Sequence, residues 1–114
     1  MKDFPTSFRF ENPEMQRELV AAIERLGVET RQQPDGTIEF KSEDWPTINR
    51  EGHKLRDKRF GRWYFCSTEP EATSHKIARL RAKSLPFEVE HHGERIVLLL
   101  PASQERQHLD AMLG

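Results

Sequence analysis

Apolar residues along the chain switch repeatedly between two spacings, one typical of strands and the other typical of helices. Apolar and polar residues alternate over 6–11, which predicts a strand, and apolar residues recur every three or four positions over 15–26, which predicts a helix. The stretches 28–31 and 37–40 alternate again, and a second helix is expected to start at Asp44. The first half of the chain is therefore predicted to run strand-helix-strand-strand-helix.

The same succession of patterns begins again near residue 60. A strand is expected around 63–65, followed by a helix that ends near Ser84. Two further strands are expected over 87–90 and 95–100, and Pro101 is expected to open a last helix. The second half is thus predicted to have the same element order as the first.

Residues that start helices and turns recur at nearly constant separation. The recurring pairs are Pro13–Glu14 with Pro70–Glu71, Gly36 with Gly93, and Pro46 with Pro101. The first two pairs are 57 positions apart and the third is 55 apart. We interpret these separations as an internal duplication within a single domain spanning 1–114, with pseudo-repeats at approximately 6–57 and 60–114.

In element order the chain resembles the ferredoxin-like plait and looks like small signal-transducing and ACT-like domains of that type. This resemblance implies an α+β fold with one six-stranded antiparallel sheet in the order 2-3-1-4-6-5. The first strands of the two repeats would pair at the centre of the sheet, and all four helices would cover one face.

Strict alternation along the expected strands assigns their side chains to the two faces of the sheet. The residues expected to face the helices are Phe8, Phe10, Ile38, Phe40, Trp63, Phe65, Phe87, Val89, Ile96, Leu98 and Leu100. On the other, mainly charged face, one apolar patch is expected, which consists of Tyr64, Val97 and Leu99 with Arg62 and Arg95 at its sides. An exposed apolar patch marks an interaction site unless another segment covers it. A protein partner or a second copy would bind there, or the N-terminal residues, Phe4 among them, would fold over it.

A basic and aromatic segment lies at 54–65. The string from Lys58 to Phe65 resembles the RNP1 motif of RNA-recognition domains. Lys58, Phe60, Gly61 and Phe65 occupy motif positions, whereas Arg59 stands in place of a glycine and Arg62 in place of a base-stacking aromatic residue. The alternative interpretation is a polar helix end followed by a core strand. If the segment binds a phosphate backbone, the expected contacts are Lys54, Arg56, Lys58, Arg59, Lys76, Arg79 and Lys83.

Composition narrows the classes of function. The net charge is −1, so no overall field attracts nucleic acid or a membrane. Cys66 is the single cysteine, which rules out an internal disulfide and is typical of a reducing compartment. The longest apolar run, Ile96–Leu100, is too short to cross a membrane, and we expect a cytoplasmic protein. The five histidines lack the paired spacing of metal ligands, so no metal or cofactor is expected.

No residue pattern in the chain is typical of catalysis, and no catalytic residue is assigned. We therefore expect a non-catalytic protein-interaction or regulatory module that binds a protein partner or forms a homodimer through its open sheet face. Binding of RNA or single-stranded nucleic acid through the basic segment is the alternative. An enzyme or a small-ligand sensor stays open as a further class, because a binding pocket cannot be read from a sequence.

Overall fold

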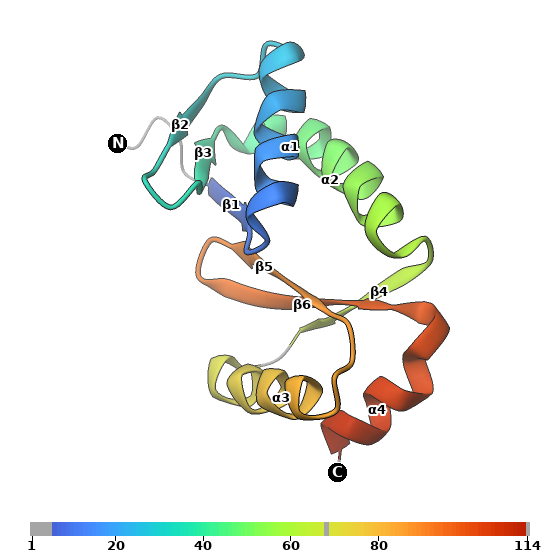
Figure 1. The fold of residues 1–114 in the computed structure, drawn as a ribbon. Coiled ribbons are helices and arrows are strands. Elements are labelled where there is room, and N and C mark those ends of the chain that lie inside the picture. Colours follow the sequence, from blue (N-terminus) through green and yellow to red (C-terminus); the bar gives the residue numbers. More distant parts are fainter. Residues whose placement is uncertain (1–5, 68, 114) are drawn as a thin grey trace.

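The computed structural model of the chain describes residues 6–67 and 69–113, so the expected role of Phe4 lies outside the described residues. These residues form an α+β fold with four helices and an open, six-stranded antiparallel sheet (Figure 1). The elements in chain order are β1 (Thr6–Phe10), α1 (Pro13–Arg25), β2 (Thr30–Gln32), β3 (Ile38–Phe40), the short 3₁₀ helix η1 (Ser42–Asp44), α2 (Trp45–Phe60), β4 (Trp63–Ser67), α3 (Pro70–Ala82), β5 (Glu88–His92), β6 (Arg95–Pro101), the 3₁₀ helix η2 (Ala102–Gln104) and α4 (Glu105–Leu113).

The two halves of the chain have the same element order, including a 3₁₀ turn before the last helix of each half. Their first helices correspond closely, because α1 and α3 both begin at a proline and both contain 13 residues. Their C-terminal caps correspond as well. Val28 N donates to Ile23 O at 3.1 Å, and 57 positions later Leu85 N donates to Leu80 O at 3.0 Å.

The equivalence expected for Pro46 and Pro101 is wrong. Pro46 lies in the first turn of α2, whereas Pro101 is the last residue of β6 and the N-cap residue of the 3₁₀ helix η2, four positions before α4 begins at Glu105. Both positions nevertheless suit proline, since the first turn of a helix and the end of a strand can each leave a backbone N–H without a partner.

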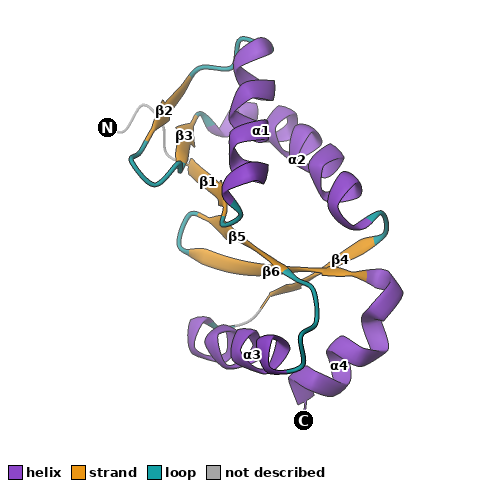
Figure 2. Ribbon diagram, viewed as in Figure 1, coloured by secondary structure: helices purple, strands orange, loops and turns teal. Residues whose placement is uncertain are grey.

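The order of the strands differs from the ferredoxin-like order. The sheet runs β2-β3-β1-β5-β6-β4, so β1 pairs with β5 and not with β4, and β4 lies at an edge (Figure 2). The predicted neighbours β4 and β6 do pair. Each half thus forms a three-stranded unit in the same order, and the halves join side by side at β1 and β5. Alternation in a strand sets which side chains share a face, but it does not choose the neighbouring strand.

The prediction that all helices cover one face is also wrong. Helices α1 and α2 lie on one face of the sheet, and α3 and α4 lie on the other (Figure 1). Strand β6 shows this directly, because Leu99 belongs to the core under α1 and α2, whereas Leu98 and Leu100 belong to the core under α3 and α4. An apolar run such as β6 needs cover on both faces, and it receives that cover.

The symmetry of the two halves explains this arrangement. Strands β1 and β5 are antiparallel, and so are β5 with β6 and β6 with β4, which makes β4 antiparallel to β1. The second half therefore keeps the left-to-right order of the first while its strands point the opposite way. A half-turn about an axis that lies in the sheet, perpendicular to the strands, together with a shift along that axis, places the second half beside the first and reverses its strands. The same rotation exchanges the two faces and carries the helices of the second half to the other side.

Candidate functional site

A buried ion pair joins the two halves of the chain. Arg56 of α2 reaches across to Glu90 of β5, where its Nε donates to Oε2 and its Nη2 donates to Oε1, both at 2.7 Å. The two side chains are 1% and 0% exposed. Asn49 Oδ1 accepts a further hydrogen bond from Arg56 Nη1 at 3.1 Å, and Gly52 leaves room, since a Cβ there would lie 3.4 Å from the guanidinium. This two-pronged geometry fixes how α2 sits over β5.

His92 extends the pair toward the surface. Its Nε2 lies 3.0 Å from Glu90 Oε1 and donates to it, because an ionised carboxylate only accepts hydrogen bonds. Burial by itself raises the pKa of Glu90, but the hydrogen bonds and positive charges of His92 and Arg56 lower it more, so that the pKa lies below its ordinary value. Glu90 is therefore ionised at neutral pH.

The imidazole of His92 also forms part of an aromatic cluster. It packs edge-on against Phe8 and Trp45, with ring centroids 4.8 and 5.4 Å apart. The Trp45 ring lies nearly parallel to Phe40, at an angle of 14° and a centroid distance of 6.0 Å. No local signal in the sequence singles out this group, because Glu90 alternates with Glu88 like a solvated strand residue and His92 stands directly before Gly93, where a turn is expected.

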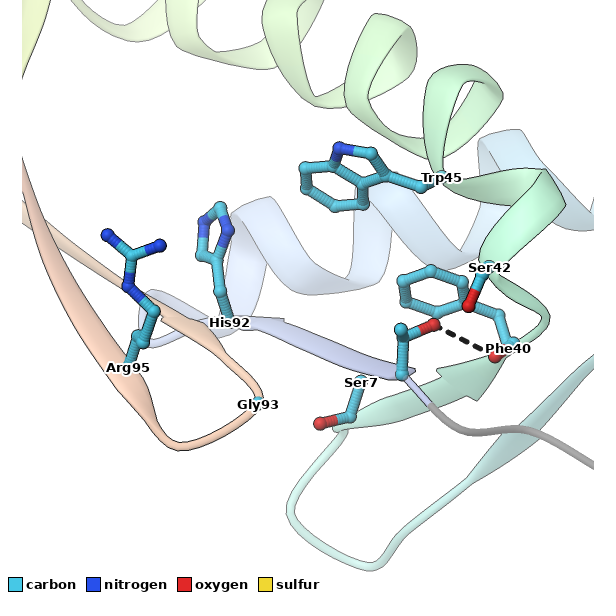
Figure 3. A pocket seen from close by; sticks show the side chains of 8 residues that line it. Ser7, Phe40, Ser42, Trp45, His92, Gly93 and Arg95 are labelled. Carbon is cyan, nitrogen blue, oxygen red and sulfur yellow. Dashed lines mark hydrogen bonds between the residues drawn. The ribbon is translucent and has the colours of Figure 1, made fainter. Parts of the chain in front are cut away.

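A hollow of about 430 Å³ opens between this cluster and the β5–β6 turn (Figure 3). It is lined by Thr6, Ser7, Phe40, Ser42, Trp45, His92, Gly93 and Arg95. Its walls come from both halves of the chain, and the side chains of His92 and Arg95 rise next to each other from the hairpin (Figure 3). We call this hollow the His92 pocket.

Strand β4 forms a second notable surface, because it is an edge of the sheet and pairs with β6 alone among the described strands. Arg62 O accepts from Ala102 N at 2.8 Å, which makes Arg62 and Ala102 a hydrogen-bonded pair. In an antiparallel ladder such pairs occur at every second residue, so the backbone groups of Trp63 and Phe65 point outward from the sheet. The Phe65 side chain is 42% exposed.

The open-face patch expected from the sequence is not present. Tyr64 is opposite Leu100 in the ladder and packs in the core under α3 and α4, whereas Val97 and Leu99 project from the other face. Val97 is 7% exposed and Leu99 is fully buried. The two arginines expected beside the patch are also apart: Arg62 is exposed at the start of β4, and Arg95 lines the His92 pocket. Helices on both faces leave no open apolar face there.

The basic residues of α2 are engaged in ion pairs. Arg56 is buried against Glu90 and cannot contact a phosphate backbone. Lys58 Nζ lies 2.7 Å from Glu18 Oε1, and Arg59 Nε lies 2.9 Å from Glu88 Oε1. Lys54 Nζ similarly lies 3.1 Å from Glu51 Oε2.

The basic residues expected to extend this surface lie on α3, on the opposite face of the sheet (Figure 1). Arg79 Nη1 donates to Met112 O at 2.7 Å, and Lys76 Nζ lies 3.7 Å from Cys66 Sγ. Lys83 is the C-terminal cap residue of α3. The two groups of cations therefore do not form one continuous surface.

Among the residues described here, no three His, Cys, Asp or Glu side chains come together as a metal site. None of the described helices combines the length and the apolar character needed to cross a membrane. Comparison of the chain with known protein families, with curated proteins and with solved structures found no match.

Proposed function

We propose that the chain is a non-catalytic protein-interaction or regulatory module, built from two copies of one βαββα unit, which associates with a second copy of itself through β4. The observation that carries this proposal is an uncharged edge strand, β4, with an exposed phenylalanine. The buried and paired positions of the basic residues favour this function over nucleic-acid binding.

The two edges of the sheet differ in how well they are protected. Edge strands are usually short or carry charges or proline, because their unpaired N–H and C=O groups otherwise attract another strand. Strand β2 follows this rule, with three residues that include Arg31. Strand β4 has five residues, Trp-Tyr-Phe-Cys-Ser, none of them charged and none a proline. It is therefore the edge that favours pairing with another chain.

Charge at the ends of β4 favours an antiparallel pair of identical strands. Arg62 is exposed just before the strand, and Glu69 is exposed just after it. An antiparallel pair centred on Phe65 places the basic end of one copy beside the acidic end of the other, and a parallel pair would bring like charges together. Phe65 then lies opposite its counterpart, an aromatic cross-strand contact that removes its exposed surface from water.

The test measures the mass of the protein in solution by sedimentation equilibrium at several concentrations. We expect a dimer of twice the 13.4 kDa chain mass that persists at high salt. Phe65→Lys places a charge at the centre of the pair and should raise the dissociation constant about thirtyfold, which corresponds to a loss of ~2 kcal/mol at an interface centre. The control is Leu26→Lys, because Leu26 is 52% exposed after α1 and lies outside β4.

Equal dissociation of the dimer by both lysine variants would contradict the role of β4, and so would a wild-type protein that stays monomeric at all concentrations. A monomer that binds single-stranded RNA with steeply salt-dependent affinity would replace this proposal with the nucleic-acid alternative.

A further inference from the structure

His108 of α4 is fully buried, yet both of its ring nitrogens contact backbone carbonyl groups. Its Nδ1 lies 2.7 Å from the carbonyl oxygen of Gln104, and its Nε2 lies 2.7 Å from the carbonyl oxygen of Pro86. Gln104 is the last residue of η2, directly before α4, and Pro86 lies in the loop that joins α3 to β5. The imidazole therefore ties α4 to this loop.

The two contacts of His108 determine how many protons its ring carries. A carbonyl oxygen only accepts hydrogen bonds, so each ring nitrogen has to donate. A neutral imidazole has a single N–H, and the lone pair of its other nitrogen would face an oxygen 2.7 Å away. Both distances also lie at the short end for N–H···O bonds, as expected for a charged donor. The geometry around His108 is therefore that of a doubly protonated, positively charged ring.

The charged groups on the elements packed against α4 do not neutralise this ring. On α4 itself Glu105 and Asp110 are exposed, and among the described residues no carboxylate forms an ion pair with His108. Strand β6 meets α4 with Leu98 and Leu100, and η2 contains no charged residue. The charged residues of α3 and of the loop after it are Glu71, Lys76, Arg79, Arg81 and Lys83. The buried charge is therefore stabilised by the two carbonyl groups.

We propose that His108 is a pH-dependent switch that holds α4 against the loop between α3 and β5. Histidine is the side chain whose charge changes between about pH 5 and 8. When the ring loses one proton to the solvent, a lone pair faces a carbonyl oxygen inside the protein, and one of the two contacts opens. The contact with Gln104 spans a single turn and moves with α4, so the contact with Pro86 is the one that opens.

The opening of this contact loosens the cover of the second half's core. Ala111 and Met112 of α4 pack there against residues that include Leu80 and Leu100. The α4 helix is thus held tightly on the acidic side of the switch and loosely on the alkaline side. The proposal is independent of the β4 association, because neither His108 nor its two hydrogen-bond partners belong to β4.

Nitrogen-15 NMR of the imidazole ring counts its protons directly. We expect two ring protons on His108 at about pH 5 and one at about pH 8. Amide hydrogen exchange follows α4 over the same range, expressed as protection factors that correct for the chemical rate of exchange at each pH. The protection of α4 should fall about tenfold as the proton is lost, because a buried polar group is then left without a partner.

Two glutamine variants separate this switch from other titrating groups. His108→Gln should remove the fall in α4 protection, whereas the control His75→Gln, which replaces an exposed histidine of α3, should keep it. The proposal is overturned if the fall is the same in both variants. It is also overturned if His108 carries a single ring proton at about pH 5 or keeps both at about pH 8. The ring measurement uses the wild-type protein, so it tests the proposal even if His108→Gln fails to fold.

Discussion

At the scale of single residues, the contact of Arg56 with Glu90 holds two charged side chains almost completely out of contact with water. Removing two charges from water is costly, and their attraction with good hydrogen-bond geometry offsets that cost. The offset fails when one partner is lost, because the other charge then stays buried alone. The contact therefore favours the observed pairing of β1 with β5, because this pairing places Glu90 beneath Arg56 of α2.

The lowered pKa of Glu90 predicts a specific loss of stability in acid. Because the pKa is lower in the folded than in the unfolded chain, the contribution is fully present above the ordinary carboxyl pKa of about 4.3 and is lost as the pH falls through the lowered value. Glu90→Gln should remove this part of the acid dependence. At neutral pH the same change should cost about 3–5 kcal/mol, since Arg56 loses its counter-charge.

Urea unfolding at a series of pH values checks this expectation. The pKa of Asp35 is also lowered, and the largest cause is its hydrogen bond with the backbone of Thr37. Asp35 is present in both the wild type and the variant. The difference between the two curves therefore isolates Glu90. Parallel curves for wild type and variant would show that Glu90 does not carry the effect.

At the scale of elements, α1 and α3 are each followed by a residue in the left-handed backbone conformation, but the two residues differ. Gly27 after α1 has a φ of 76°, and Ser84 occupies the corresponding position after α3 with a φ of 55°. Glycine adopts this left-handed conformation without a steric penalty, whereas serine has a Cβ that crowds the backbone. The second half therefore carries a strain that the first half avoids.

Exchanging these residues should change stability in opposite directions. Gly27→Ser should destabilise the fold by about 1 kcal/mol, and the cause is the backbone alone, because a Cβ at that position meets no atom within 4 Å. Ser84→Gly should stabilise it by about 0.5 kcal/mol, since relief of strain is partly offset by the entropy of the unfolded glycine. Midpoints of urea unfolding at constant slope measure both changes. Two changes of the same sign would show that the caps are not equivalent.

At the scale of the whole molecule, the two halves share parts of their cores. Leu99 comes from the second half but packs in the core formed by α1, α2 and the first half's strands. Arg56 comes from the first half and pairs with the second. The first half therefore completes its core only with Leu99 of the second half, whereas the other core is made of second-half residues. Because Leu99 and the Arg56–Glu90 pair join the two halves, we expect the chain to unfold as one cooperative unit.

Leu99→Ala tests this cooperation. The leucine is fully buried, so the cavity should cost about 2–5 kcal/mol. Amide hydrogen exchange should speed up equally in the most protected strands of both halves. The control is Leu26→Ala, which removes an exposed leucine and should stay within about 0.5 kcal/mol of wild type. Faster exchange in only one half would contradict a single cooperative unit.

Local features were predictable wherever the residues nearby in sequence decide them. Asn12 caps α1, where its Oδ1 accepts from Glu14 N at 2.9 Å, and Gly36 and Gly93 take the positive φ values expected of hairpin turns. The candidate surfaces were harder to predict. Tyr64 and Leu99 alternate correctly within their strands, yet the ladder pairs Tyr64 with Leu100, which places Tyr64 and Leu99 on opposite faces.

The sequence by itself determined the succession of elements and the alternation within each strand, because both follow from the local spacing of apolar residues. The apolar run Ile96–Leu100 also indicated that β6 needs cover on two faces, although a partner or the N-terminal residues were expected to cover the second face. Only the tertiary structure decided that β1 pairs with β5, that β4 becomes an edge, and that the helices divide between the faces. These choices depend on contacts between residues far apart in the chain, such as Arg56 with Glu90, and a strand's own pattern is the same whichever neighbour it takes.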